Sequence, residues 1–424
     1  MRKLTTLDNK LRIITQRMKV RDSVSVGVWF GVGGRYENSQ NKGIAHFMEH
    51  LAFKGSRNYS CEQIKQQVEG VGGSLNAFTS EEETCFYAKV PRKHLNKTFD
   101  ILSDISFFPQ ITKSDLEKER TVILEEIKMY HDLPQYYVME LLEQLLWPNH
   151  PLGEGLAGTS QTVSNLKQAD LKAFQQHYYV PDNVVVSLCG DIKHDEVVDV
   201  IAKKLAHLKG HKPDRYIPAR KTQDTPTGRF YTKDTEQMHL ALGFLGYETN
   251  HKDYYVLALL SIMLGGNMSS RLFNEVREKR GLAYSIGSSF KSLDDTGVFM
   301  VRAGVDNSKI ESALDVILKV LRKVARQGVT ADELKRGKDY FSGQFLLGLE
   351  DTMDHMIWLG AGLMSRDKIN TPEIVVQKIQ AVTLADIKRV ADEILNPQRL
   401  NVSLIGPLDE KLESQLRVVA GLSR

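Results

Sequence analysis

Apolar and polar residues alternate along residues 11–32, first in LRIITQ and then in SVSVGVWFGVGG. A period of two is typical of β-strands, so two strands are predicted there. SLNAFTS and TCFYAKV alternate on either side of the acidic turn Glu81–Glu83, which predicts a hairpin. VVVSLCGDI is almost continuously apolar and predicts a buried strand. GIAHFMEHLAFKG and CEQIKQQVEGVGG have helical patterns, and glycines favour termination of the second helix.

The order of predicted elements in the first half of the chain recurs in the second half. VSLCG at 186–190 returns as VSLIG at 402–406, an offset of 216 residues. ITKSDLEKER at 111–120 resembles VTADELKRGK at 329–338, an offset of 218 residues. The two offsets agree and nearly halve the chain of 424 residues. An internal duplication explains both matches, because repeated units leave self-similarity at a fixed spacing.

Residues 207–228, HLKGHKPDRYIPARKTQDTPTG, are rich in Pro, Lys and Arg and poor in apolar residues, which is typical of an interdomain linker. We therefore predict an N-terminal domain over 1–206 and a homologous C-terminal domain over 229–424. Long helical patterns mixed with alternating strands favour an α+β fold. Each domain is expected to be an α/β sandwich, a mostly antiparallel sheet packed with helices, and the pair to be arranged like a clam.

Composition narrows the class of protein. The formal net charge is only +3 and no basic run is interleaved with aromatic residues, so no nucleic-acid partner is expected. The apolar run VLALLSIML is too short to cross a bilayer and the N-terminus has no apolar signal region, so no membrane association is expected. Three widely spaced cysteines favour free thiols. A cytoplasmic protein of bacterial type is predicted, or a mitochondrial-matrix protein if a transit peptide has been removed.

His46, Glu49 and His50 lie in the predicted helix GIAHFMEHLAFKG. Positions i, i+3 and i+4 share one face of a helix, so the three side chains project together. Two imidazoles one turn apart can bind one zinc ion, and the glutamate can take a proton from a water on that ion. This H-x-x-E-H order is the reverse of the commoner zinc-peptidase motif. The alternative is a pair of ordinary polar histidines.

A catalytic zinc site needs a third protein ligand. The segment ERTVILEEI offers Glu119, Glu125 and Glu126. Glu119 and Glu126 are two helical turns apart and share a face, whereas Glu125 points about 100° away from Glu126. The spacing leaves open which of the shared-face pair binds the metal and which orients the site. A solvated helix face is the alternative for all three glutamates.

The duplication provides an internal control for these residues. At an offset of 218 residues, Glu119 corresponds to Gly337 and Glu126 to Gln344, and the helical segment YYVLALLSIMLGGNMSSRL contains no histidine. The second copy thus has the pattern of the scaffold without the candidate ligands. Residues required for folding alone would be present in both copies, so metal chemistry confined to the first half is favoured.

Four segments together resemble the pitrilysin-type inverted zinc metallopeptidases, in particular the short subfamily of the mitochondrial processing peptidase β subunit and its bacterial homologues. These segments are HFMEHLAFKG at 46–55, GGSLNAFTSEEET at 72–84, ERTVILEEI at 119–127 and SSRLFNEVREKRGLAYS at 269–285. The resemblance runs nearly end to end. It implies one Zn²⁺ per chain bound by His46, His50 and Glu126, with Glu49 as the general base and Glu119 orienting the ligands.

The resemblance also implies residues that handle the substrate. In the second half, Arg277 would hold the peptide and Tyr284 would stabilise the oxyanion; without the resemblance they would be interpreted as a solvated helix residue and a core residue. Asn76 and Ala77 would offer a strand edge to an extended peptide, although small alternating residues also suit core packing. Phe53 would line the pocket after the scissile bond.

The expected function is that of a zinc-dependent endopeptidase that hydrolyses short or unfolded peptides inside a chamber. Similar family members assemble two chains, so a homodimer is expected and a heterodimer is the alternative. Tyr136 and Glu140 stand where the processing peptidase has two acidic residues that select arginine, so arginine-directed cleavage is not implied. The competing function is that of a non-catalytic partner subunit of a processing-peptidase-like complex.

Overall fold

The computed structural model describes residues 1–219, 223–366 and 369–422, so residues 220–222 of the predicted linker lie outside the described residues. By internal packing the chain divides into two compact units. Unit 1 comprises Met1–Lys128, Gly155–Ile217 and Leu346–Ile369, and unit 2 comprises Met129–Glu154, Pro218–Phe345 and Asn370–Arg424.

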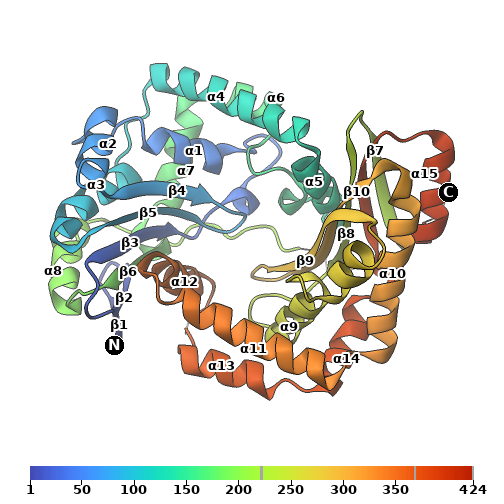
Figure 1. Ribbon diagram of the computed structural model, residues 1–424. Helices are drawn as coiled ribbons and strands as arrows, with labels where there is room; N and C mark the ends of the chain where they lie inside the picture. The colour runs from blue at the N-terminus through green and yellow to red at the C-terminus, as the bar shows by residue number, and fades with distance from the viewer. Residues whose placement is uncertain (220–222, 367–368, 423–424) are drawn as a thin grey trace. The chain divides into compact units, whose positions relative to one another are not determined.

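Unit 1 is built on a mixed sheet that has six strands among the described residues, in the order β1-β2-β6-β3-β5-β4 (Figure 1). Neighbouring strands are antiparallel except for the parallel pair β2 and β6. The strands are β1 Arg2–Thr6, β2 Arg12–Arg17, β3 Ser23–Phe30, β4 Ser74–Thr79, β5 Thr84–Pro91 and β6 Val184–Gly190. The two N-terminal strands, the hairpin and the buried strand were predicted. Strand β1 was not, because RKLTT has a single large apolar residue and so no periodic signal.

Unit 2 is built on a second mixed sheet, with five strands in the described chain in the order β7-β11-β8-β10-β9. Its strands are β7 Thr227–Thr232, β8 Gln237–Leu245, β9 Ala283–Ser292, β10 Gly297–Asp306 and β11 Asn401–Gly406. Apart from β1, the two sheets have the same strand order and the same single parallel pair. VSLCG forms most of β6 and VSLIG most of β11, which occupy equivalent places. The predicted duplication and α+β class are confirmed.

Helices cover both sheets (Figure 1). In unit 1 they are α1 Ile44–Ala52, α2 Cys61–Glu69, α3 Leu95–Phe107, α4 Lys113–Asp132, α6 Ser160–Asn165, α7 Gln168–Tyr178, α8 His194–Leu205 and α12 Thr352–Ser365. In unit 2 they are α5 Pro134–Leu146, α9 Tyr254–Gly265, α10 Ile310–Gln327, α11 Ala331–Gly348, α13 Pro372–Ala381, α14 Leu384–Ile394 and α15 Glu410–Ala420. The last turns of α4 and α11 cross the unit boundaries.

Strand β3 is buried on both faces, which its alternating sequence alone did not reveal. Val26 and Val28 belong to the core cluster that contains residues of α1 and α3. Trp29, on the opposite face, belongs to another cluster with Met356 of α12. Gly27 leaves room for α12, because a Cβ on it would lie 2.5 Å from the sulfur of Met356. The face that carries Gly27 and Trp29 therefore packs against a helix rather than facing solvent.

Strand β8 of unit 2 has the same arrangement with α5. Leu240 and Leu242 face the main core of the unit, while Ala241 lies in a second cluster with Leu142 of α5. A Cβ on Gly243 would lie 2.9 Å from a methyl group of Leu142. Helix α5 thus packs on unit 2 although it comes from the first half of the sequence, and α12 packs on unit 1 although it comes from the second half.

The compact units therefore differ from the predicted boundaries of 1–206 and 229–424. Those boundaries follow the two sequence repeats, whereas packing assigns Met129–Glu154 to unit 2 and Leu346–Ile369 to unit 1. The physical reason is that α5 and α12 bury their apolar faces on strands encoded in the other repeat.

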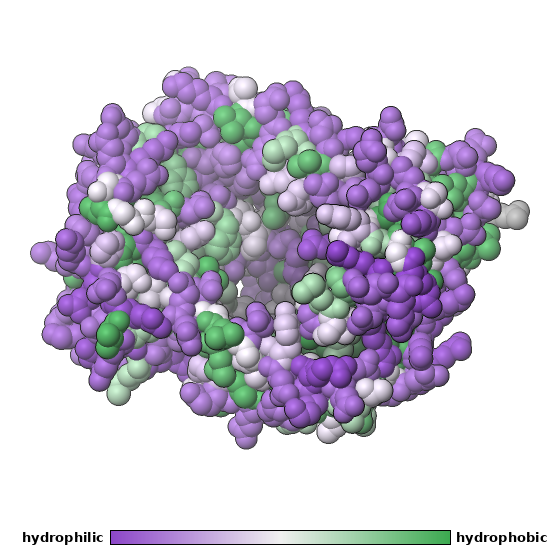
Figure 2. Space-filling model, viewed as in Figure 1, coloured by the Kyte–Doolittle hydropathy of each residue, from purple (hydrophilic) through white to green (hydrophobic). Residues whose placement is uncertain are grey.

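Hydrophilic residues cover most of the face shown in Figure 2, with hydrophobic residues in small separate groups. Among the described helices, none combines the length and the apolar character that a membrane span requires. Cys61, Cys85 and Cys189 are free thiols in the described chain.

Candidate metal centre

Helix α1 presents His46 and His50 one turn apart on the same side. Its apolar side is buried through Ile44, Ala45, Phe47, Met48, Leu51 and Ala52. The helix starts after Gly43, which has a left-handed φ of 91°. A Cβ at this position would lie only 2.5 Å from the carbonyl oxygen of Ala157. Only glycine suits such a position, so the residue fixes where the histidine-bearing helix begins.

A buried carboxylate holds the first turn of α1. Glu37 Oε1 accepts a hydrogen bond from the N–H of Ala45 at 2.8 Å, and Oε2 accepts one from the N–H of Gly43 at 3.0 Å. The ammonium of Lys42 lies 3.3 Å from Oε2. Burial raises the pKa of Glu37, while Lys42 and the two amides lower it. The sequence did not single out Glu37, because this cap comes from a residue well before the helix rather than from its N-cap position.

Helix α4 carries the carboxylates that were candidates for a third ligand. Glu126 Oε2 lies 3.7 Å from His46 Nε2 and 3.5 Å from His50 Nε2. Glu119, two turns earlier, is buried and Glu125 is two-thirds exposed and paired with Lys128. The structure thus brings Glu126 to the histidine pair and turns Glu125 to the surface.

His46, His50 and Glu126 form a group whose ligand atoms all lie within 4.8 Å of one another. The carboxylate–imidazole separations of 3.5 and 3.7 Å are too long for hydrogen bonds. Three electron-pair donors that face each other at this separation suit a shared cation. Two imidazole nitrogens and one carboxylate oxygen are also a donor set that zinc uses in catalytic sites.

The electrostatics of His46 favour the neutral imidazole that a metal requires. Burial, and to a smaller extent the neighbouring ring of His50, lower its pKa to about 4. The two ring centroids are 4.6 Å apart. Among the described residues, His46 Nδ1 is buried and has no hydrogen-bond partner. On the side of Nδ1, the ring of His46 is therefore held in place by packing alone.

A carboxylate and an ammonium group lie behind His50. Glu119 Oε2 is 3.2 Å from His50 Nδ1, and Glu119 Oε1 is 2.6 Å from the ammonium of Lys54. A carboxylate on the second ring nitrogen of a metal-binding histidine fixes its tautomer and its orientation. Sequence reasoning missed Lys54, although its position four residues after His50 was a signal for the same helix face.

Glu49 lies beside the histidines and is oriented by strand β4. The hydroxyl of Thr79 donates a hydrogen bond to Glu49 Oε2 at 2.6 Å. Burial raises the pKa of Glu49; Thr79 and His50 lower it and Glu126 raises it. A half-buried carboxylate of raised pKa suits a general base. Thr79 was not singled out from the sequence, because only the packing of α1 against β4 brings it to Glu49.

Strand β4 is the terminal strand of its sheet and pairs with β5 on one side. Asn76 is exposed and Ala77 is buried. The N–H of Ala77 donates to the side-chain oxygen of Asn76 at 2.9 Å. Phe53, at the end of α1, is half-buried and its ring lies 6.3 Å from that of Phe86.

Arg277 and Tyr284 belong to unit 2. Arg277 lies in the π-helical segment η5, Phe273–Glu278, and Tyr284 is the second residue of β9. The guanidinium carbon of Arg277 is 5.8 Å from the centroid of the Tyr284 ring and 4.8 Å from that of Phe273. Tyr284 is 73% exposed, so its interpretation as a core residue was wrong.

In unit 2, α9 and α11 are equivalent to α1 and α4. A cavity lies at the place that corresponds to the histidines and the glutamate of unit 1. The cavity measures about 270 Å³, and Met263 of α9 and Gly337 of α11 are among its lining residues. Gly337 is the counterpart of Glu119, and a Cβ there would lie 3.0 Å from Met263 Cγ. Among the described residues, the second copy therefore lacks the candidate ligands, and a side chain at position 337 would require a small shift of Met263.

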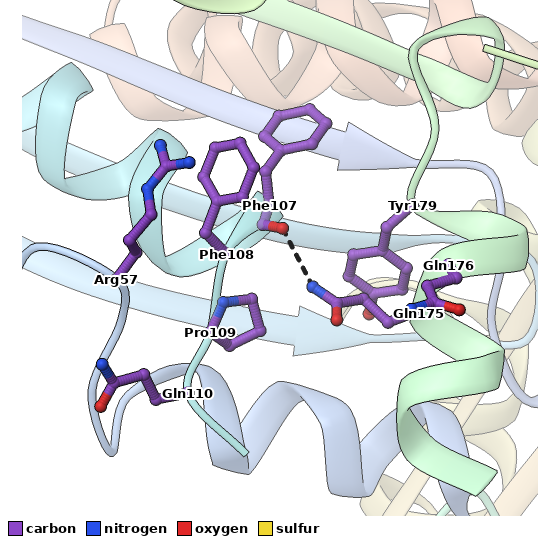
Figure 3. A pocket seen from close by; sticks show the side chains of 8 residues that line it. All are labelled: Arg57, Phe107, Phe108, Pro109, Gln110, Gln175, Gln176 and Tyr179. Carbon is purple, nitrogen blue, oxygen red and sulfur yellow. Dashed lines mark hydrogen bonds between the residues drawn. The ribbon is translucent and has the colours of Figure 1, made fainter. Parts of the chain in front are cut away.

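Another cavity, of about 440 Å³, opens in unit 1 beside the end of α3 and α7 (Figure 3). Its lining residues are Arg57, Phe107, Phe108, Pro109, Gln110, Gln175, Gln176 and Tyr179. The side chain of Gln175 donates to the carbonyl oxygen of Phe107 at 3.0 Å. None of these eight residues is a carboxylate, a histidine or a cysteine, so the cavity provides no metal ligand or general base.

The similarity of this chain to known proteins is consistent with a metal site at these residues. Residues 12–160 match the model of the insulinase domain of peptidase family M16, and residues 165–341 match that of the M16 inactive domain. An uncharacterized zinc protease of Bacillus subtilis, YmxG, is 35% identical over 95% of this chain and 97% of its own. An uncharacterized zinc protease of Streptomyces coelicolor is also 35% identical, over 97% of this chain and 91% of its own.

Solved structures have the same fold. The crystal structure of a protease from Helicobacter pylori has a TM-score of 0.91 and 27% identity, and the match covers 96% of this chain and all of that one. A structure described as a peptidase M16 inactive domain, from Pseudomonas fluorescens, has a TM-score of 0.89 at 20% identity and supports the fold alone. The chain therefore belongs to peptidase family M16, and its group of two histidines and a glutamate lies in the segment that matches the insulinase domain.

Proposed function

We propose that this protein is a zinc-dependent endopeptidase that hydrolyses short or unfolded peptides. The observation that carries the proposal is the convergence of His46, His50 and Glu126 within 4.8 Å, beside a half-buried Glu49. Relatives that are named as zinc proteases support this proposed activity.

The proposed metal is one Zn²⁺ per chain, held by His46 Nε2, His50 Nε2 and the Glu126 carboxylate. Bound there, zinc supplies Lewis acidity, which polarises the scissile carbonyl and lowers the pKa of water toward about 7. Burial lowers the pKa of His46 and so favours its neutral imidazole, and Glu119 orients His50 through its Nδ1.

Glu49 is the proposed general base. Its carboxylate takes the proton of the attacking water and passes it to the leaving amine, which needs a side chain that can hold a proton for part of the cycle. The hydrogen bond from Thr79 fixes one carboxylate oxygen, so the orientation of the base is set before substrate arrives. Glu119 is proposed to orient His50 through its Nδ1.

Substrate binding is assigned to two regions. An extended peptide pairs with the edge of β4 at Asn76 and Ala77, since a terminal strand can take another strand by backbone hydrogen bonds. Phe53 contributes an apolar wall to the pocket after the scissile bond. In unit 2, Arg277 holds the peptide and the exposed Tyr284 donates to the oxyanion. The support for Arg277 and Tyr284 is the family resemblance of VREKRGLAY together with the exposure of the tyrosine.

The proposal extends to a homodimer, on the resemblance to family members that assemble two chains. Light scattering of the purified protein should give twice the mass of the chain. A monomer that cleaves peptides at full rate would refute this extension without affecting the zinc site.

The decisive experiment compares the wild type with Glu49→Gln. Metal analysis should find one zinc per chain in both, and turnover of a quenched peptide library should fall roughly 10²- to 10⁴-fold in the variant. Full activity of the variant would refute the role of Glu49. Zinc in the wild type with no cleavage of any peptide would favour the non-catalytic partner subunit instead.

A further inference from the structure

Three residues lie four apart along one side of α1 and the turn that follows it. His46 and His50 are in the helix, and Lys54 comes two residues after its end. The N–H of Lys54 still donates to the carbonyl oxygen of Leu51 at 3.0 Å, so the chain continues to wind beyond the helix. A four-residue spacing places side chains one turn apart on the same face, so Lys54 extends the row of the two histidines.

The facing helix α4 carries two carboxylates two turns apart. Glu126 lies within 3.7 Å of both histidines. Glu119 lies between His50 and Lys54: Oε2 is 3.2 Å from His50 Nδ1 and Oε1 is 2.6 Å from the Lys54 ammonium. Each oxygen of this one carboxylate therefore has a different partner, and Lys54 fixes the oxygen that His50 does not use.

We propose that Lys54 is a positioning residue of the metal centre, which acts on His50 through Glu119. By holding one oxygen of Glu119, Lys54 prevents rotation of the carboxylate and keeps the other oxygen on His50 Nδ1. The tautomer that results has its lone pair on Nε2, the nitrogen that faces Glu126. This inference rests on the proposed zinc site and adds a residue that helps to build it.

Burial distinguishes this ion pair from the surface pairs of the same helix. The side chain of Glu119 is 6% exposed and that of Lys54 is 32% exposed. By contrast, Lys128 and Glu125 form a pair on α4 at 2.7 Å with both side chains about two-thirds exposed. A buried carboxylate depends on its partners for solvation, whereas an exposed one has water. Lys54 therefore has an effect on Glu119 that Lys128 does not have on Glu125.

The charges around the histidines also favour a role for Lys54 at Glu119. Glu49, Glu119 and Glu126 bring three carboxylates close to one another, and Lys54 is the ammonium in contact with one of them. With a divalent cation in place, the formal charges of the three carboxylates would be balanced by the cation and Lys54. Without Lys54 the centre would carry an excess negative charge next to a carboxylate that must keep a fixed orientation.

The test is the zinc affinity of purified protein, measured by competition with a chromophoric chelator. Lys54→Met should weaken zinc binding about tenfold, the low end of the range for partners that orient metal ligands. Lys128→Met is the matched control and should bind zinc like the wild type. Circular dichroism and the melting temperature of the metal-free proteins establish that both variants are folded.

A coupling measurement separates this role from a general structural one. Glu119→Gln should itself weaken zinc binding, and adding Lys54→Met to it should cause little further loss, because Lys54 acts through that carboxylate. An equal tenfold loss in the Glu119→Gln background would overturn the proposal.

The outcomes also separate this inference from the proposed function. Zinc bound equally well by wild type and Lys54→Met would refute the role of Lys54 and leave the metal site standing. A folded wild type that binds no zinc would refute the proposed function itself. If Lys54→Met does not fold, Lys54→Gln takes its place, with a smaller loss in the same direction, because it removes the charge that pairs with Glu119 Oε1.

Discussion

Gly360 of α12 lies directly against the indole of Trp29 in β3. A Cβ built on Gly360 would come within 2.1 Å of two ring atoms of the tryptophan. Trp29 cannot move aside, because it is fully buried and its Nε1 donates to the hydroxyl of Ser187 at 2.8 Å. This contact fixes α12 on the sheet whose far face supports α1.

The contact predicts that Gly360→Ala destabilises the protein. The added methyl group would force the helix or the indole to shift, which typically costs about 1–3 kcal/mol. Gly343→Ala is the control, since a Cβ at that helical position meets nothing within 4 Å and should stabilise α11 by about 0.5–1 kcal/mol. Urea unfolding of both variants measures the difference. Equal stability of the two would mean that α12 does not pack as described.

Glu37→Gln should weaken the start of α1. The substitution takes a buried carboxylate away from the Lys42 ammonium and from the amides of Gly43 and Ala45. Removal of one member of a buried ion pair costs about 3–5 kcal/mol, and urea unfolding of the metal-free protein can measure it. Asp409→Asn at the exposed cap of α15 is the control, with an expected loss below about 1 kcal/mol. A loss no larger than the control would contradict the role of Glu37.

Thr79→Val should lower catalysis while zinc stays bound. The variant removes the hydroxyl that holds Glu49 Oε2 but keeps a similar shape. We expect kcat to fall about tenfold with little change in KM, because the base loses its fixed orientation rather than its chemistry. Thr79→Ser keeps the hydroxyl and should recover most of the activity. A zinc-free Thr79→Val protein would instead assign the residue to metal binding.

Tyr284→Phe should lower kcat without changing stability. Loss of one hydrogen-bond donor to an oxyanion typically costs roughly 10²–10³-fold in kcat. The residue is 73% exposed, so the melting temperature should stay at the wild-type value. Tyr340→Phe, another exposed tyrosine of unit 2, is the control and should turn over peptides like the wild type. Unchanged kcat in Tyr284→Phe would remove the tyrosine from the mechanism.

The pair of Arg271 and Glu333 should make unit 2 more stable in a pH-dependent way. Two hydrogen bonds of 2.5 and 2.7 Å join them, and the Arg271 guanidinium lowers the pKa of Glu333 to about 2. A folded pKa below the unfolded value of about 4.5 gives stabilisation that is present above pH 4.5 and is lost as the pH falls toward 2.

Arg271→Met should therefore cost about 2 kcal/mol at pH 7 and progressively less between pH 4.5 and pH 3, as urea unfolding at several pH values would show. Lys335→Met breaks an exposed ion pair with Asp339 on the same helix and should cost little at any pH. A pH-independent loss in Arg271→Met would mean that Glu333 is not its partner.

Local periodicity was sufficient to predict much of the fold. The apolar side of α1 and the alternation in β3, β4 and β5 follow from which residues neighbour one another along the chain. The match of VSLCG in β6 with VSLIG in β11 also indicated the duplication, which the equivalent strand orders of the two sheets confirm. Strand β1 and the exchange of α5 and α12 were not predicted, because pairing and packing across the chain decide them.

The candidate site, like the fold, could be predicted only in part from local spacing. Helical spacing placed His46, Glu49 and His50 on one face, since that depends only on the pitch of a helix. Spacing did not distinguish Glu119 from Glu126, which are equivalent by pitch. The family resemblance selected Glu126, and the structure places this residue next to both histidines.

The sequence by itself determined the two repeats, the faces of the helices and the family. Only the tertiary structure decided which carboxylate of α4 faces which residue of α1. It also brought Lys54 to Glu119, Thr79 to Glu49 and Glu37 to the start of α1. The physical reason is that helical pitch is set by neighbouring residues, whereas the approach of α1, α4 and β4, distant in the chain, is set by how their apolar faces pack into one core.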